Sequence, residues 1–468
     1  MQFQPHKPRK WLICLLTASI LFPLLPKATA AATEFTDIQG HWAYDSIQKM
    51  TERGVFQGET PTLFAPEHTV TRAMYVTMLA RYDGYNPSAY TTSKFKDVPA
   101  DSWYGPAVAW ASQHGIVSGV SPTSFAPDRP ITREDLAVIT VNYANYAWKI
   151  LPRTRPGKLF SDSSRCANYS LDAIYTLYRA GIINGMPDGS FRPKGNATRA
   201  ECAAILSTYM DTWSRAYLSS EKVPLVAHSG CSLTAPENTM PAYQAAADLG
   251  YGAVETDIRF TRDGVPVLIH DATINRTSNG SGAVAAMTYN QLLQYDFGSW
   301  KSASYAGTQI ATLGQLLSLC RDRGLHAYLE IKPTLISAEQ AQTLVQTVSA
   351  YGMQDHVTWI SYHYTNALTR IRAVDRTAQL GMLADDVTDS IIRQAVKLKN
   401  GSNYVFLGVK HTSLNGDKRT ACLRNGLDFG VWTIDSMAYG VTAANTAAIY
   451  ITTDGLTWNT LYGTYGTT

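Results

Sequence analysis

Short apolar runs alternate with helical patterns along the second half of the chain. Eight such runs lie between residues 223 and 468: PLVAH, AVETDI, HAYLEIK, HVTWISYH, QLGML, YVFLGVK, DFGVWTID and AIYITTDG. A further run, PVLIHD, follows AVETDI shortly after. Strands that alternate with helices predict a parallel sheet, and eight over about 245 residues (468 − 223) fit a closed (β/α)8 TIM barrel. The longer piece from Ala272 to about Ala311 is expected to be an insertion over the barrel mouth.

Before residue 223 the pattern is mainly helical and repeats three times. The units open with Phe35-Thr36-Asp37, Phe95-Lys96-Asp97 and Phe160-Ser161-Asp162, and Thr71-Arg72, Thr132-Arg133 and Thr198-Arg199 recur near their ends. Each Thr is expected to cap a helix, with Glu134 and Glu201 in the first turn. The regular spacing of these motifs along the chain indicates tandem modules. We predict α-helical repeats at 33–91, 92–156 and 157–212, a linker at 213–222 and an α/β barrel at 223–468.

Residues 1–32 have the order of a secretory signal. A basic start, MQFQPHKPRK, precedes the apolar run WLICLLTASILFPLL, and small residues follow in PKATAAATEF. Cleavage after Ala30 or Ala32 fits this order, and an uncleaved anchor is the alternative. The apolar run is short for a membrane span and no later segment qualifies, so we expect a secreted mature chain without a transmembrane span.

Composition and charge narrow the possible partners. A chain of 468 residues with 45% hydrophobic residues is long enough for two or three packed domains. The net charge of +3 and the absence of a basic run interleaved with aromatics argue against nucleic acid. The cysteines after the signal, Cys166, Cys202, Cys231, Cys320 and Cys422, match no zinc spacing. Cys166 and Cys202 could pair, but isolated buried thiols are the plainer expectation.

The candidate chemistry lies around the run AVETDI. If this run is a strand, Glu255 and Asp257 point to the same side, because side chains two apart share a face. Two adjacent carboxylates repel each other unless a cation joins them. A hard divalent metal held by oxygens, with His228 and His270 moving protons, is the simplest chemistry that explains the set. Taken singly, each of these residues is more often an ordinary strand-end or surface residue.

Ordered motifs extend this set of residues. They are His228-Ser229-Gly230, Pro236-Glu237-Asn238-Thr239, Glu255-Thr256-Asp257, Asp263-Gly264, His270-Asp271 and Asn275-Arg276-Thr277. From about Val223 to near the C-terminus the chain resembles the glycerophosphodiester phosphodiesterase family, whose members are TIM barrels. The resemblance implies release of glycerol 3-phosphate and an alcohol, directly or through a cyclic phosphate. Glu255, Asp257 and Glu330 would hold Ca2+ or Mg2+, and His228 and His270 would act as general base and general acid.

Further residues are expected at the substrate: Lys332, Arg276, Glu237, Asn238 and Trp432. Lys332 would steady the phosphoryl oxygens, and Trp432 would line the glycerol side. Glu237 and Asn238 are candidates for ordering the metal site. The family usually has arginine where this chain has Ser229, and we expect Arg276 to supply some of the missing positive charge.

The three N-terminal units resemble S-layer homology domains, which hold proteins to cell-wall polysaccharide. By this resemblance the acidic wall glycan would be contacted by Asp37, Trp42, Arg72, Asp97, Trp103, Arg133, Asp162 and Arg199. A guanidinium fork suits carboxylates. The first unit has Met74 where the motif has an acid, and the third has no matching Trp.

Three functions therefore compete. The preferred one is a phosphodiesterase attached to the bacterial cell wall or S-layer, acting on deacylated phospholipid heads or on glycerophosphate polymers. The second is a related barrel lyase that stops at a cyclic phosphate. The third is a catalytically weak wall-glycan-binding protein, which only Ser229 favours.

Overall fold

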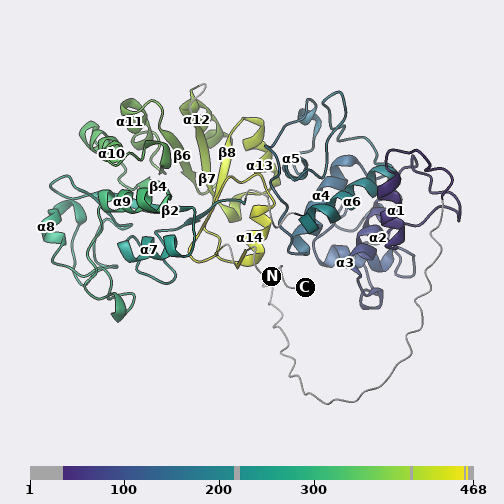
Figure 1. Cartoon of the computed structure of the whole chain (residues 1–468), viewed down its shortest axis with the longest axis horizontal. Helices are drawn as coiled ribbons and strands as arrows, with labels where there is room; N and C mark the ends of the chain where they lie inside the picture. The colour runs from purple at the N-terminus through teal and green to yellow at the C-terminus, as the bar shows by residue number, and fades with distance from the viewer. Residues whose placement is uncertain (1–34, 216–221, 401–403, 458–459, 462–468) are drawn as a thin grey trace, which may run out of the picture.

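The computed structural model describes residues 35–215, 222–400, 404–457 and 460–461. The expected signal sequence and most of the expected linker lie outside these ranges. Figure 1 shows two parts side by side, with the N-terminal helices in purple and blue on the right and a strand-containing part on the left. Across the described residues, no helix combines the length and the apolar character that crossing a membrane requires.

The C-terminal part is a closed barrel of eight parallel strands. They are β1 (Leu225–Ala227), β2 (Ala253–Phe260), β4 (His326–Ile331), β5 (Val357–Ser361), β6 (Gln379–Ala384), β7 (Val405–Lys410), β8 (Asp428–Trp432) and β9 (Ile451–Thr453). β1 pairs with both β2 and β9, and this pairing closes the sheet. The short β3 (Pro266–Leu268) lies antiparallel to β2. The predicted TIM barrel is therefore confirmed, and PVLIHD forms a hairpin strand outside the eight.

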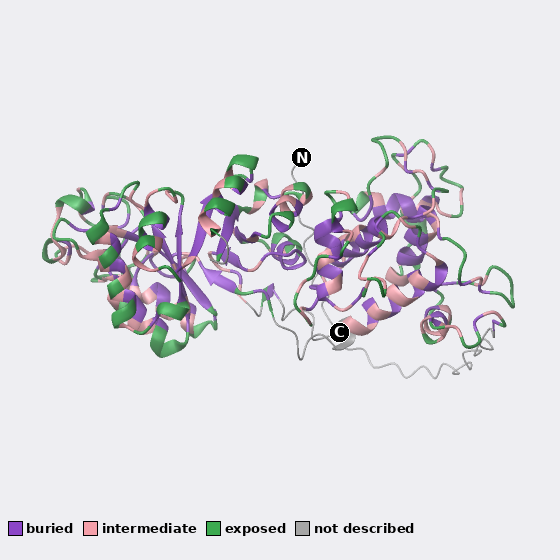
Figure 2. Cartoon of the chain, turned by 90° about the horizontal axis from the view of Figure 1, so that it is seen from above, coloured by how far each residue is buried: buried purple, intermediate pink, exposed green. Residues whose placement is uncertain are grey.

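Helices surround this barrel and bury the outer faces of the strands. They are α7 (Met240–Asp248), α9 (Leu313–Arg323), α10 (Ala338–Ala350), α11 (Ala367–Val374), α12 (Asp389–Lys399), α13 (Gly416–Arg424) and α14 (Met437–Ala444). The strands are buried on both faces, which explains why they read as continuous apolar runs (Figure 2). A small apolar cluster that includes Val226, Leu383 and Phe406 lies inside the barrel.

The insertion has a small apolar core of its own, which includes Ile274, Leu292 and Phe297. It contains η3 (Val284–Ala286), α8 (Tyr289–Leu292) and η4 (Ala303–Tyr305). Lys301 Nζ donates a hydrogen bond of 2.7 Å to the carbonyl oxygen of Ser232, in the loop after β1. The insertion is thus fastened to the carboxyl end of a barrel strand, where the mouth of a TIM barrel lies.

The three repeats close into a ring through backbone hydrogen bonds between each neighbouring pair. Their helices are α1 (Tyr44–Glu52), α2 (Arg72–Asp83), α3 (Gly105–Gln113), α4 (Arg133–Tyr146), α5 (Leu171–Arg179) and α6 (Arg199–Arg215), with short turns η1 (Pro87–Ala89) and η2 (Ser163–Arg165). The N–H of Ile131 donates to the carbonyl oxygen of Val70, the N–H of Ala197 donates to that of Ile131, and the N–H of Val70 donates to that of Ala197. These three distances are 2.8 to 3.0 Å. As predicted, Thr71, Thr132 and Thr198 cap the helices that follow.

The repeated aspartates and arginines have distinct positions in this ring. Each aspartate accepts backbone N–H groups within its own repeat, as Asp97 does from Phe125 at 2.8 Å. Each arginine reaches the next repeat, as Arg72 Nε does when it donates to the carbonyl oxygen of Phe125 at 3.0 Å. Arg133 reaches Phe191 and Arg199 reaches Phe64 in the same way. These arginines therefore stabilise the contacts between repeats.

The third repeat packs against α13 of the barrel through α5, and the second repeat packs against α14 through α4. Asp172 on α5 is buried, and its carboxylate accepts from Arg419 Nε at 2.8 Å and from the N–H of Ala447 at 2.9 Å. Asn445, also buried, donates to Asn145 and to the carbonyl oxygen of Lys149. Further bonds cross the boundary from Arg153, Arg179, Thr420 and Arg424. The repeats and the barrel thus share a polar interface.

The cysteines at 166, 202, 231, 320 and 422 are all free and buried. Cys166 and Cys202 do not pair, and the expectation of isolated thiols is confirmed.

Candidate active site

Three carboxylates meet inside the barrel at the carboxyl ends of two adjacent strands. Glu255 and Asp257 alternate along β2, and Glu330 lies beside Asp257 on β4 in the register of the sheet. Their oxygens lie within 4.8 Å of one another, and all three residues are buried. The strand period that predicted the shared face of Glu255 and Asp257 therefore places both on the inner side of the barrel.

One cation of the chain compensates part of this negative charge. Lys332 Nζ lies 2.8 Å from Glu330 Oε1 and 3.4 Å from Asp257 Oδ1. Burial opposes ionisation of Asp257, but Lys332 and His270 outweigh it and lower the pKa of that carboxyl. Burial and the charge of Asp257 raise the pKa of Glu255. The cluster thus lacks positive charge for all three carboxylates to ionise together.

The donor set fits a hard divalent cation. Glu255 Oε1 is buried and has no hydrogen-bond partner within the described part of the chain, although a buried polar atom normally has one. Carboxylate oxygens are the ligands that Ca2+ and Mg2+ prefer. A bound cation would satisfy the unpaired oxygen and supply the missing charge, so these residues suit the metal that the sequence predicts.

His228 is held by a carboxylate that the sequence analysis missed. Its Nδ1 lies 2.7 Å from Asp454 Oδ1, which also accepts from Ser232 Oγ at 3.0 Å. Its Nε2 lies 4.0 Å from Glu255 Oε2. Burial alone lowers the pKa of His228, but Asp454 and Glu255 raise it to about 10. The sequence offered one signal that could have identified Asp454. It lies near the end of the last apolar run, AIYITTDG, directly after the strand β9.

His270, like His228, is positioned by a carboxylate. Its Nδ1 lies 2.8 Å from Asp271 Oδ1, and Arg276 Nε donates to Asp271 Oδ2 at 2.7 Å. Arg276 also binds Glu237 through two bonds of 2.6 and 2.8 Å. Neither Arg276 nor Glu237 lines the cavity described below. The two residues brace the loops that carry the two histidines, and their contact with substrate stays a prediction.

Ser229 and Asn238 hold the carboxylates of Glu255 and Asp257 in place through hydrogen bonds. Both have positive φ, 52° and 56°, which turns their backbone sharply beside β2. The N–H of Ser229 donates to Glu255 Oε2 at 2.9 Å. Asn238 Nδ2 donates to Asp257 Oδ2 at 2.8 Å, and its Oδ1 accepts the N–H of Asp257 at 3.0 Å. Asn238 thus orders the predicted metal site, and in the described structure it does not line the cavity.

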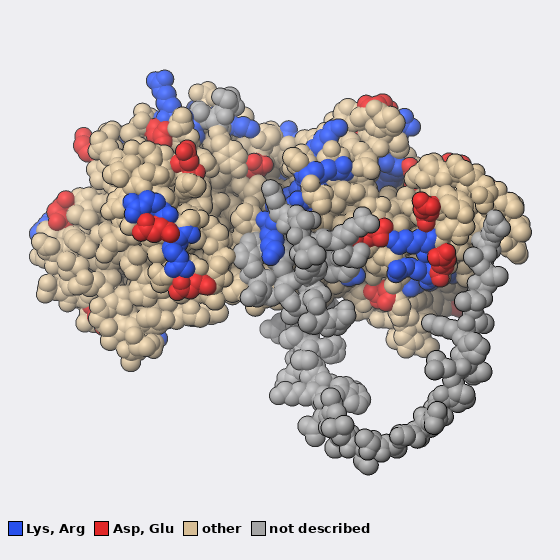
Figure 3. All heavy atoms as spheres, viewed as in Figure 1, with Lys and Arg blue, Asp and Glu red and all other residues tan. Residues whose placement is uncertain are grey.

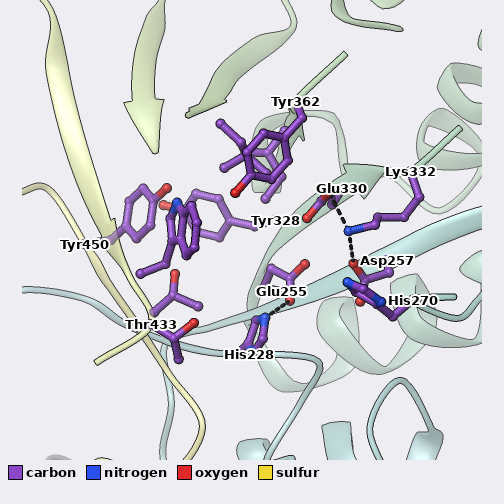
Figure 4. Close-up of a pocket in the computed structure, with 14 residues that line it drawn as sticks. His228, Glu255, Asp257, His270, Tyr328, Glu330, Lys332, Tyr362, Thr433 and Tyr450 are labelled. Carbon is purple, nitrogen blue, oxygen red and sulfur yellow. Dashed lines mark ion pairs between the residues drawn. The ribbon is translucent and has the colours of Figure 1, made fainter. Parts of the chain in front are cut away.

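A cavity of about 240 Å³ joins these groups to an aromatic wall. Its lining includes His228, Glu255, Asp257, His270, Glu330 and Lys332 on one side and Tyr328, Ile360, Tyr362, Leu383, Trp432 and Tyr450 on the other. Figure 4 shows the histidines and carboxylates facing the labelled tyrosines across the cavity. Lys332 and Trp432 both line this cavity, and their contacts with substrate stay predictions.

On the face shown in Figure 3, acidic and basic side chains are interspersed and most of the surface has neither. That face therefore offers no extended basic patch of the kind that binds nucleic acid.

The barrel and this cavity define a TIM-barrel enzyme with its polar site at the carboxyl ends of the strands. Residues 228–456 match the model of the glycerophosphoryl diester phosphodiesterase family, and residues 34–73, 94–137 and 159–203 match the S-layer homology domain. The C-terminal half of the chain therefore belongs to the glycerophosphoryl diester phosphodiesterase family, and three S-layer homology repeats precede it.

Individual relatives match either part of the chain. A glycerophosphodiester phosphodiesterase of Caldanaerobacter subterraneus is 28% identical over 46% of this chain and 86% of its own. An amylopullulanase of Thermoanaerobacterium thermosulfurigenes is 33% identical over 37% of this chain, which spans only 9% of that relative. A solved phosphodiesterase of Oleispira antarctica, in complex with sn-glycerol 3-phosphate, is 24% identical over 50% of this chain and 93% of its own, with a TM-score of 0.47.

Proposed function

We propose that the chain hydrolyses glycerophosphodiesters to glycerol 3-phosphate and an alcohol while its repeats hold it to the cell wall. The observation that carries the proposal is the arrangement of three buried carboxylates and two histidines around one cavity. The family match supports the same reaction class.

Each imidazole has an assigned task in this proposal. Asp454 and Asp271 accept from the Nδ1 atoms, which leaves the Nε2 atoms of His228 and His270 free to exchange protons with the substrate. A cation bound at the three carboxylates offsets the charge of Glu255 that raises the pKa of His228. In its neutral form His228 removes the proton of the attacking hydroxyl, and His270 gives a proton to the oxygen of the leaving alcohol. Lys332 donates to a phosphoryl oxygen.

Glu255, Asp257 and Glu330 would hold the Ca2+ or Mg2+ ion. When bound there, the ion supplies positive charge that screens the phosphate oxygens. Asn238 and Ser229 keep two of these carboxylates in place through the bonds described above.

Metal removal tests this part of the proposal. We expect the full chain to release glycerol 3-phosphate from glycerophosphocholine with Mg2+ or Ca2+, and to lose this activity in chelator because the phosphate oxygens then lack the positive charge that the ion supplies. Added metal should also raise the unfolding temperature, since it binds the folded state. Product analysis by phosphorus NMR separates hydrolysis from a lyase reaction that stops at a cyclic phosphate.

The matched control is Asp257→Asn, which removes a ligand and keeps the side-chain shape. This variant should show a much smaller rise of the unfolding temperature with metal. Full activity in chelator would contradict the proposal.

For the repeats, we propose that an acidic wall glycan is bound by the predicted residues Asp37, Trp42, Arg72, Asp97, Trp103, Arg133, Asp162 and Arg199, or beside them. A cavity of about 500 Å³ lies against Arg72 and is also lined by Arg129, Asp135 and Tyr169. Two guanidinium groups share the single carboxylate of Asp135 there, so positive charge remains for an acidic sugar. Trp42 and Trp103 are 66% and 62% exposed and offer flat faces to sugar rings.

Arg129→Ala tests this assignment, because Arg129 is half exposed whereas Arg72 is buried and joins two repeats. We expect the variant to bind purified cell walls about tenfold more weakly, the size expected for one charge-assisted hydrogen bond. Arg321→Ala, an equally exposed arginine on the barrel, is the control and should bind as the parent chain does. Equal binding by all three proteins would exclude this cavity.

A further inference from the structure

The aromatic wall of the active-site cavity ends in a corner at the barrel mouth. Tyr362 directly follows β5 and Trp432 ends β8. Their rings lie 6.1 Å apart at 76°, close to perpendicular. Both line the active-site cavity. Two aromatic faces therefore meet at a right angle beside the place where a phosphate would sit.

A carboxylate stands beside this corner. Asp385 directly follows β6, two residues after Leu383, which lines the cavity. Side chains two apart share a face, so Asp385 lies above Leu383 on the side of the mouth. The Tyr362 hydroxyl donates to Asp385 Oδ1 over 3.4 Å. Burial, with the charges of Asp385 and Glu330, raises the pKa of Tyr362.

Asp385 also differs from its neighbour in charge pairing. Asp386 forms an ion pair with Lys418. Within the described ranges, no Lys, Arg or His nitrogen lies within ion-pair distance of Asp385, whose side chain is exposed. The mouth thus presents one unpaired negative charge next to two aromatic faces.

Given the phosphodiesterase activity proposed above, we propose that this corner, which the sequence analysis assigned to the glycerol side through Trp432, instead selects substrates whose alcohol carries an ammonium group, as in choline or ethanolamine esters. Aromatic faces attract cations, and the attraction is largest for Trp and Tyr. The Asp385 carboxylate adds a complementary charge. A neutral polyol gains from neither, so the corner distinguishes a cationic head group from a second glycerol.

The test is the ratio of kcat/KM for glycerophosphocholine to that for glycerophosphoglycerol, measured on the full chain with saturating metal. We expect a ratio of about five to thirty in the parent chain, as one cation–π contact and one charge predict. Asp385→Asn should lower the ratio to about three or less, and Tyr362→Leu should also lower it. Asp386→Asn is the matched control and should keep the parent ratio.

A parent ratio near one, or a ratio unchanged by Asp385→Asn, would overturn the proposal. Equal losses on both diesters in Tyr362→Leu would instead place a glycerol arm in the corner and would also overturn it. If neither diester is cleaved, the phosphodiesterase assignment fails separately. Choline binding to the full chain, followed by saturation-transfer NMR, then decides: weaker binding by Asp385→Asn than by Asp386→Asn supports the corner, and equal binding excludes it.

Discussion

Replacement of His228 by alanine is expected to lower kcat for glycerophosphocholine by about 10²- to 10⁴-fold, the usual contribution of a well-placed general base. His228 is positioned by the bond of 2.7 Å between its Nδ1 and Asp454. No other histidine in the described structure, apart from His270, lines the cavity and could take over the proton. The measurement is steady-state release of glycerol 3-phosphate with saturating metal.

The control is His356→Ala. This histidine is exposed and lies just before β5, at the end of the barrel away from the cavity. Its loss should leave kcat unchanged. A His228→Ala variant that retains more than about a tenth of the parent kcat would remove the base from the mechanism.

The carboxylate cluster was partly predictable because two of its members are neighbours on one strand. Glu255 and Asp257 are two residues apart, and the period of a strand is enough to place them on one face. Glu330 is more than seventy positions away, counted as 330 − 257, and its place beside Asp257 depends on β2 and β4 pairing in register. The resemblance to the family, rather than the local pattern, supplied that third ligand.

The supporting bonds were less predictable because they depend on contacts between distant loops. Asp454 reaches His228 across 226 positions of the chain. Arg276 was expected to replace the charge missing at Ser229, but Glu237 and Asp271 bind its guanidinium fork. Residue type alone indicated a cation near the phosphate, whereas the loop geometry gives that cation two carboxylate partners outside the cavity.

In the repeats, too, some features follow from the local sequence and others depend on contacts between distant residues. Helix caps at Thr71 and Thr132 follow from local sequence, because the capping oxygen bonds a backbone N–H three residues ahead. By contrast, the residue that each of Arg72, Arg133 and Arg199 binds depends on how the three repeats close into a ring. The acid that pairs with Arg133 is Glu201 of the following repeat, so Met74 in the first repeat changes the surroundings of Arg199 and not those of Arg72.

Replacement of Asp172 by alanine is expected to destabilise the whole chain by about 3 kcal/mol, the lower end of the range for breaking a buried ion pair. The change leaves Arg419 without its carboxylate and the buried N–H of Ala447 without an acceptor. Because Asp172 belongs to the third repeat and both partners belong to the barrel, the loss falls on the interface. Urea unfolding followed by tryptophan fluorescence and by residual activity measures it.

In the parent chain we expect both signals to change at the same urea concentration, since the interface couples the two parts. In Asp172→Ala the two midpoints should fall and separate, because each part then unfolds with less support from the other. Asp248→Ala is the control, since its ion pair with Arg323 is exposed and lies within the barrel. Unshifted midpoints in Asp172→Ala would mean that the polar contacts between the repeats and the barrel contribute nothing to stability.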